Sequence, residues 1–215
     1  FVNHLRSLNG IDDTTAGSSG WATEGDRVRN KRAQQAAFLA DLVETRQQAN
    51  PDENIVLVGD FNAFEFNDGY TDVMGIVRGD QVPAAQVLTW IESPITTPLV
   101  DGSELIADPA ERYSYVFEGS AQTLDHVVVN EALVMDPGTA AVAIEHARIN
   151  ADFGVHNFGV AGNAIRTSDH DPVRLSIRRV ADASGPAISY TLSPAPANGS
   201  NGWYTVNVLV DWTVI

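Results

Sequence analysis

One long segment of the chain has helical spacing, and it lies among short apolar runs separated by polar and glycine-rich stretches. Over residues 27–48 the apolar positions form one stripe, and Asn50-Pro51 stops the pattern. The stretch from Thr23 to Asp26 resembles the capping box that opens a helix, with Asp in place of Glu or Gln. These features predict a single long helix near the start of the chain.

The remaining apolar segments predict strands. Residues 55–58 (Ile-Val-Leu-Val) form an apolar run bounded by Asn54 and Gly59, which is typical of a buried strand. Further strands are predicted at residues 1–2, 113–117, 124–129, 142–149 and 173–177, with a short helix at 68–77. Residues 9–26, 79–110 and 150–167 carry turn and breaker residues and predict irregular chain.

The composition changes near residue 181, which predicts a domain boundary. Residues 181–186 (Ala-Asp-Ala-Ser-Gly-Pro) have the character of a linker. Apolar residues alternate again at 188–192 and 203–215, but two or three strands this short cannot bury a core of their own. We therefore expect a main domain over residues 1–180, and over 181–215 a linker and the beginning of an Ig-like β-sandwich module.

The charge and cysteine content of the chain exclude some kinds of site and binding surface. The 215 residues carry a formal net charge of −15 and contain one lysine, Lys31, so no basic footprint for nucleic acid is present. There are no cysteines, which excludes disulfides and thiolate metal sites. No run of about 18 apolar residues occurs, so no membrane-spanning helix is expected. An acidic surface attracts divalent cations, and metal ions with a few arginines would have to neutralise a phosphate substrate locally.

Polar side chains follow or begin several of the predicted strands. They are Asn3 with His4, Asp60 with Asn62, Asp125, and the run 168–172 (Ser-Asp-His-Asp-Pro). Asp60 and Asn62 also suit a simple turn, and a histidine near a strand end is commonly structural. Asp125 is different, because a carboxylate beside a buried strand costs several kcal/mol unless it is paired. Asp125 therefore needs a partner such as an imidazole or a metal ion.

Together these groups match the needs of phosphodiester hydrolysis. That reaction requires a water oriented and deprotonated in line with phosphorus, and stabilisation of charge on the phosphoryl oxygens. A His paired with an Asp can take the proton of the water, and carboxylates can hold Mg²⁺ or a similar hard cation. A second His and an Asn can donate hydrogen bonds to phosphate oxygens.

Five ordered segments carry a resemblance to a known family. They are residues 2–7 (VNHLRS), 59–63 (GDFNA), 113–117 (YSYVF), 122–126 (QTLDH) and 168–173 (SDHDPV). Over about residues 1–178 the chain resembles the C-terminal two-thirds of the endonuclease/exonuclease/phosphatase superfamily, with the DNase I-like fold. It looks closest to the extracellular bacterial nucleases of that family. The resemblance implies an α+β fold, the four-layer α/β/β/α sandwich.

The resemblance also implies roles for individual residues. His170 would be the general base on the attacking water, and Asp125 would orient it. Asp169 would ligate or bias a divalent metal, and Asp60 would position the nucleophile or bind the metal, with Mg²⁺ expected first and Mn²⁺ or Ca²⁺ as alternatives. Asn62 and His4 would contact the scissile phosphate. Groove or support roles are open for three further residues, which suit core or surface positions equally well: Tyr113, Tyr115 and Arg166.

Other polar residues are expected to be structural. Arg32 is predicted on a solvated face of the helix, and we expect no site role for His126, His146 and His156.

The family's N-terminal part, which supplies an early Asn, the main metal-ligating Glu and several strands, has no counterpart in this sequence. The expected partners are therefore that part of the same polypeptide, a nucleic acid substrate and a downstream Ig-like module. The leading hypothesis is a metal-dependent phosphodiesterase, a secreted bacterial nuclease acting on DNA or RNA. A lipid or small-molecule phosphoesterase of the same superfamily and a non-catalytic extracellular scaffold are the alternatives.

Overall fold

The computed structural model describes residues 1–180 and 188–214, so the linker predicted over 181–186 lies outside the described residues. Contacts divide the chain into two compact units, Phe1–Arg179 and Val180–Ile215. No helix in the described residues is long and apolar enough to cross a membrane. The α-helices are α1 (Glu24–Ala49), α2 (Val73–Arg78) and α3 (Glu131–Met135). Short 3₁₀ helices lie at Ala84–Gln86, Gly102–Leu105, Pro109–Glu111, Val155–Asn157 and Ser200–Gly202.

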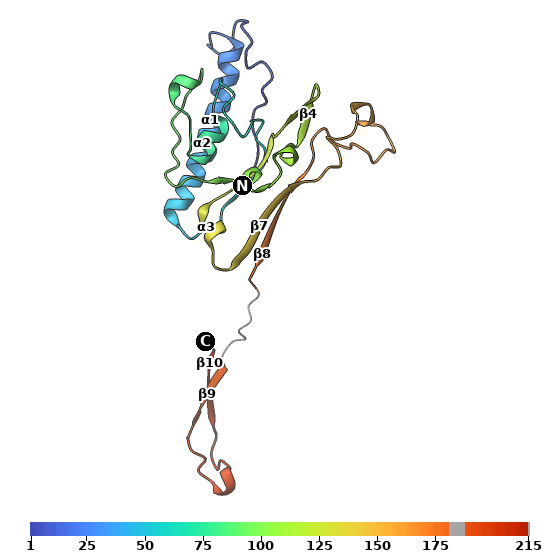
Figure 1. The fold of residues 1–215 in the computed structure, drawn as a ribbon. Helices are drawn as coiled ribbons and strands as arrows, with labels where there is room; N and C mark the ends of the chain where they lie inside the picture. The colour runs from blue at the N-terminus through green and yellow to red at the C-terminus, as the bar shows by residue number, and fades with distance from the viewer. Residues whose placement is uncertain (181–187, 215) are drawn as a thin grey trace. The chain divides into compact units, whose positions relative to one another are not determined.

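The strands of the first unit form one mixed sheet and two hairpins (Figure 1). The sheet has the order β1-β2-β6-β3, in which β1 pairs with β2 in parallel and the other pairs are antiparallel. The strands of this unit are β1 (Val2–His4), β2 (Val56–Asp60), β3 (Val100–Asp101), β4 (Tyr115–Phe117), β5 (Ser120–Gln122), β6 (Asp125–Val129), β7 (Thr139–His146) and β8 (Val173–Arg179).

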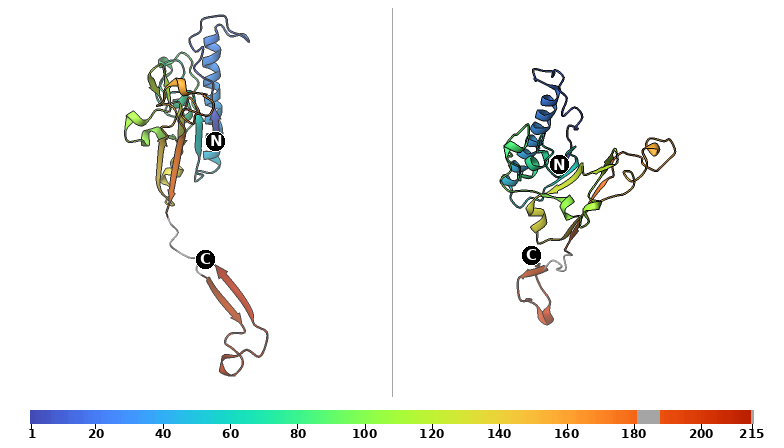
Figure 2. Two further views of the ribbon diagram at one scale, coloured as in Figure 1. Left: turned by 90° about the vertical axis from the view of Figure 1, so that its right-hand side faces the viewer. Right: turned by 45° about the horizontal axis from the view of Figure 1, so that its top comes forward.

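The two faces of the sheet bury different layers. Leu57 and Val128 pack with apolar residues of α1 and α2, whereas Val127 and Val129 pack against Ile144 of the β7–β8 hairpin. Figure 2 shows α1 and the β7–β8 hairpin on different sides of the sheet. This is a mixed α/β architecture with a helical layer, a central sheet and a second sheet layer among the described residues. The fourth layer of the expected sandwich stays a prediction.

The long helix begins where the sequence predicted. The Thr23 hydroxyl accepts from the backbone N–H of Asp26, and the Asp26 carboxylate accepts from the N–H of Thr23, so Asp completes the capping box. Val28, Ala36, Ala40 and Val43 form the buried stripe of α1.

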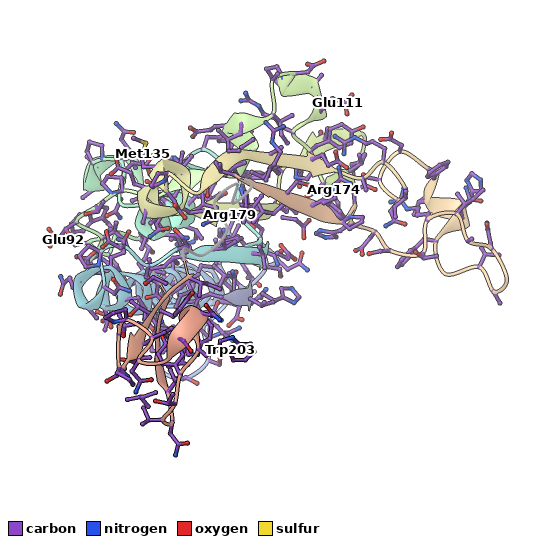
Figure 3. The ribbon with its side chains drawn as sticks, turned by 90° about the horizontal axis from the view of Figure 1, so that it is seen from below. Glu92, Glu111, Met135, Arg174, Arg179 and Trp203 are labelled. Carbon is purple, nitrogen blue, oxygen red and sulfur yellow. The ribbon has the colours of Figure 1, made fainter. Side chains whose placement is uncertain are left out.

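Two features fix how the strands pack. Gly59 has φ of +141°, and a Cβ there would lie 1.9 Å from the carbonyl oxygen of Asn3, so only glycine lets β1 approach β2 this closely. On the β7–β8 hairpin, Arg174 pairs with Glu145 and Arg179 pairs with Asp136; Figure 3 labels both arginines along β8.

In the second unit, β9 (Ile188–Ser193) and β10 (Leu209–Val214) form an antiparallel two-stranded sheet. Tyr190 lies opposite Trp212, and their ring centroids are 5.4 Å apart. Several apolar side chains of this hairpin are exposed, among them Ile188, Leu209 and Trp212. The Ig-like module to which we expect this hairpin to belong stays a prediction.

Candidate active site

The candidate residues meet at the edge of the sheet where β1 and β2 end and β6 begins. The strand register places His4 beside Asp60 and Asp60 beside Asp125, so the three residues form one cross-strand row. Side chains of directly paired residues lie on the same face of a sheet. Asp60 and Asp125 therefore share the face that is covered by the second sheet layer.

Asp125 has the imidazole partner that its position in the sequence required. Nδ1 of His170 lies 2.6 Å from Oδ2 of Asp125. The hydroxyl of the buried residue Ser114 donates to the same oxygen at 2.7 Å and accepts from the backbone N–H of Asp125 at 3.1 Å. Because the carboxylate accepts from Nδ1, the neutral imidazole keeps its lone pair on Nε2, the atom that can accept a proton.

The surroundings of His170 favour its protonated form. Burial lowers the pKa of His170, but the hydrogen bond to Asp125 and the negative charges of Asp125, Asp60 and Asp169 outweigh burial, so the pKa lies above its ordinary value of 6.5. Because its pKa is raised, the neutral imidazole of His170 is a stronger base than a free imidazole.

The turn after β2 is held by its own side chains. The carboxylate of Asp60 accepts from the backbone N–H of Asn62 at 2.7 Å and from the Asn62 side-chain amide at 2.8 Å. That amide also donates to the carbonyl of Leu5 at 3.1 Å. His4, whose side chain is 77% exposed, lies with Nε2 3.3 Å from Asp60. Burial raises the pKa of Asp60, and the nearby charge of Asp125 adds to the rise, against the hydrogen bond from Asn62.

Two buried side chains hold the next two carbonyls of this turn. Arg32, from α1, donates to the carbonyl of Asn62 at 2.7 Å and to that of Arg6 at 2.7 Å. Nε2 of His126 lies 2.8 Å from the carbonyl of Ala63. The prediction that Arg32 lies on a solvated face was wrong: its side chain is fully buried, and burial lowers its pKa to about 10, against the charge of Asp68.

His126 has structural contacts, and they favour its protonated form. A carbonyl can only accept, so Nε2 of His126 carries a proton, while Nδ1 lies 3.0 Å from the buried carboxylate of Asp101. Burial lowers the pKa of His126, but the hydrogen bond to Asp101 outweighs it and raises the pKa overall. The pair is an ion pair on the helix side of β6.

Three groups at the sheet edge could hold a metal ion. Asp60, Asp125 and His170 each offer a ligand atom, and these atoms lie within 4.8 Å of one another. Carboxylate oxygens suit Mg²⁺, which takes one or two carboxylates and keeps several waters. The carboxylate of Asp169 is exposed and is not a member of this group, so its role as a ligand stays a prediction.

The loop that delivers His170 is anchored by its neighbour Asp171. This buried carboxylate accepts from the backbone N–H groups of Ile149, Asn150 and Ala151, and from Arg148. The N–H of Asp171 also donates to the carbonyl of Ser114 at 2.7 Å. Ser114 and Asp171 lie within the segments 113–117 and 168–173 that carry the resemblance, but the sequence predicted no role for either of them. The available signal for a role was a polar side chain inside an apolar segment in the case of Ser114, and a carboxylate directly before a proline in the case of Asp171.

Of the three residues whose roles were left open, Tyr115 contacts the candidate base, whereas Tyr113 and Arg166 make structural contacts. The ring of Tyr115 packs against the imidazole of His170, with ring centroids 4.6 Å apart and an interplanar angle of 30°. The ring of Tyr113 lies under the guanidinium of Arg148, and Arg166 is buried and donates to the carbonyl of Phe153, so both have structural contacts.

A cavity of about 360 Å³ adjoins this edge of the sheet. Its lining includes Phe64 and Phe66, which follow the Asp60–Asn62 turn, and Gln122 and Thr123, which precede Asp125. The arrangement as a whole offers an oriented imidazole base, a group that could bind a cation, and an exposed histidine, all at one edge of the sheet. These are the parts that hydrolysis of a phosphate ester requires.

Comparison with known proteins gives structural similarity alone. No protein-family model matches the sequence, and no curated protein matches it significantly. Among solved structures, the truncated TDP2 of Caenorhabditis elegans aligns with a TM-score of 0.46 at 14% identity, over 82% of this chain and 53% of that one. A second structure of TDP2 from C. elegans aligns with a TM-score of 0.45 at 13% identity, over 82% and 40%. The chain therefore spans about half or less of the length of these structures.

Proposed function

We propose that this protein is a metal-dependent phosphodiesterase that hydrolyses DNA or RNA. The observation that carries the proposal is the Asp125–His170 pair, 2.6 Å apart and facing Asp60 across β6 and β2. An oriented imidazole beside a carboxylate that could bind a cation has no evident use in a scaffold. The ordered motifs that resemble the endonuclease/exonuclease/phosphatase superfamily support the same assignment.

Each residue has a definite task in the proposed reaction. His170 takes a proton from the attacking water at Nε2, while Asp125, held by Ser114, keeps the imidazole in the required tautomer. His4 would donate to a non-bridging phosphate oxygen. The Asn62 amide donates to Asp60 and to the carbonyl of Leu5 in this structure, so a contact with phosphate requires it to release one of these acceptors. Asp60, with Asp169, would hold the cation. A divalent cation, Mg²⁺ in our proposal, supplies charge stabilisation at the phosphoryl oxygens when bound.

The remaining parts of the proposal rest on the resemblance. We propose secretion from a bacterium, completion of the sheets by a further part of the same polypeptide, and a downstream Ig-like module.

Cleavage assays test the proposal. Plasmid DNA, single-stranded DNA and RNA are incubated with the protein and Mg²⁺ or Mn²⁺, and EDTA is expected to stop cleavage. His170→Ala should lower turnover at least about 100-fold, the scale of lost general-base catalysis. His156→Ala is the matched control, because His156 is an exposed histidine whose ring contacts only Asn157 among side chains. If wild-type protein leaves nucleic acids and bis-aryl phosphodiesters intact with either metal, the proposal fails. Cleavage of phospholipid headgroups alone would favour the lipid phosphoesterase.

A further inference from the structure

Two aromatic rings of the β4–β5 hairpin lie next to one another, and the first of them contacts the candidate base. The ring of Tyr115 lies 4.6 Å from the imidazole of His170, and the ring of Phe117 lies 6.4 Å from that of Tyr115, at an interplanar angle of 16°. Tyr115 and Phe117 are two residues apart on β4, so they lie on one face of the strand. The two rings of β4 are therefore nearly parallel, and the imidazole is tilted by 30° against the first of them.

The hairpin presents these rings in a fixed orientation. β4 and β5 are joined by Glu118 and Gly119, whose φ angles are +49° and +84°. Positive φ at both central residues is the signature of the type I′ turn, which matches the twist of the paired strands. At the base of the hairpin, Tyr115 bridges to His170 through the backbone. The hairpin is thus tied to the segment that carries the base.

Phe117 is accessible, and the charges around it are unfavourable for a phosphate backbone. Its side chain is 51% exposed. Around His170, against which Tyr115 packs, the charges are those of the carboxylates Asp60, Asp125 and Asp169, and the whole chain has a net charge of −15. Backbone-directed binding of nucleic acid depends on lysines and arginines that neutralise phosphates. Affinity for the substrate beyond the metal site must therefore come from contacts that do not depend on charge.

We propose that Tyr115 and Phe117 form a stacking platform for an unpaired nucleobase next to the scissile phosphate. This inference rests on the proposed function, and it specifies the substrate as single-stranded nucleic acid or unpaired ends. Stacking on aromatic rings tolerates any base and contributes the affinity that the acidic surface lacks. In a duplex the base faces are covered by neighbouring bases, so paired nucleotides gain nothing from the platform.

Variants of Phe117 test the platform, because Phe117 is exposed and is not a member of the Asp60, Asp125 and His170 group. Phe117→Ala should weaken binding of a single-stranded oligonucleotide and raise its KM by roughly 5- to 100-fold, the range for stacking of one base. Phe117→Leu keeps apolar area without a flat ring and should behave like Phe117→Ala, whereas Phe117→Trp should retain wild-type affinity. Phe38→Ala is the matched control, since Phe38 is a 67% exposed phenylalanine on α1.

Binding and cleavage are measured separately on the full chain. Fluorescence anisotropy in EDTA, where no cleavage is expected and His170 is intact, reports binding of three probes: a labelled single strand, the same strand with abasic sites, and the matched duplex. Loss of affinity in Phe117→Ala that is confined to the strand with bases supports the platform, even if no cleavage is found and the proposed function fails. Equal affinity of Phe117→Ala and wild type for the single strand overturns it. An equal loss for duplex or abasic strand also overturns it, even if cleavage is robust.

Discussion

Asp125 and His126 are consecutive residues of β6, and each belongs to an imidazole–carboxylate pair on a different face of the sheet. Asp125 pairs with the half-buried His170 at 2.6 Å, and His126 pairs with the fully buried Asp101 at 3.0 Å. The alternation of side chains along a strand separates the two pairs. One pair faces the candidate site, and the other fixes the turn that completes it, through the carbonyl of Ala63.

The protonation of His170 is expected to depend on Asp125. In metal-free protein the pKa of His170 lies above 6.5 because the hydrogen bond and charge of Asp125 outweigh burial. Asp125→Asn removes the charge, so the pKa should fall and the base form should persist to lower pH. NMR titration of the imidazole measures this in EDTA. Asp169→Asn should give a smaller fall, and an unchanged His170 in Asp125→Asn would contradict the assignment.

The buried pair of His126 and Asp101 should make stability depend on pH. The folded-state pKa of His126 is raised above 6.5, so its contribution is fully present below about pH 6.5 and is lost as the pH rises through the raised value. Thermal unfolding of wild type and Asp101→Asn is compared from pH 5 to pH 9. The stability advantage of the wild type should shrink across this range, and a constant difference would refute the ion pair.

Arg32 should contribute far more stability than its neighbour Lys31. Arg32→Ala leaves the carbonyls of Arg6 and Asn62 and the carboxylate of Asp68 without their buried cation, and should cost about 3 kcal/mol. Lys31→Ala removes an exposed side chain one position along α1 and should change stability by less than about 0.5 kcal/mol. Urea unfolding provides both values. Similar values for the two variants would mean that the turn does not depend on Arg32.

Divalent metal should stabilise the protein through Asp60. Asp60 and Asp169 are the proposed ligands, so Mg²⁺ or Mn²⁺ should raise the melting temperature, and a concentration of 100 times Kd corresponds to about 2.7 kcal/mol. Asp60→Asn should lose most of this shift. Asp41→Asn, an exposed carboxylate on α1, should keep it. A shift that survives in Asp60→Asn places the metal elsewhere.

The elements that depend on local signals could be predicted from the sequence. The capping box at Thr23 and Asp26 and the apolar run before Gly59 fixed the start of α1 and the position of β2. Asp125 was correctly expected to need a partner, because the cost of an unpaired carboxylate beside a buried strand does not depend on the fold. The partner, His170, lies 45 residues further along the chain.

Contacts between distant segments were harder to predict. Arg32 was placed on the surface because nothing near it in the sequence shows that the turn after β2 would supply carbonyl acceptors. Asp101 lies in β3, a strand of only two residues within the stretch 79–110, whose sequence predicts irregular chain. No local sequence pattern therefore indicates that Asp101 is buried against His126. Such pairings depend on tertiary packing, which a local pattern does not record.

The register of β2 and β6 limits the insertions and deletions that the site can tolerate during evolution. A slip of one residue would place Gly59 opposite Asp125 and turn Asp60 toward α1, although every amino acid would still be present. Insertions and deletions between Ile55 and Ala63 should therefore be absent from any lineage that keeps the chemistry. Length variation should instead accumulate in distant loops such as residues 150–167, where no strand pairing is disturbed.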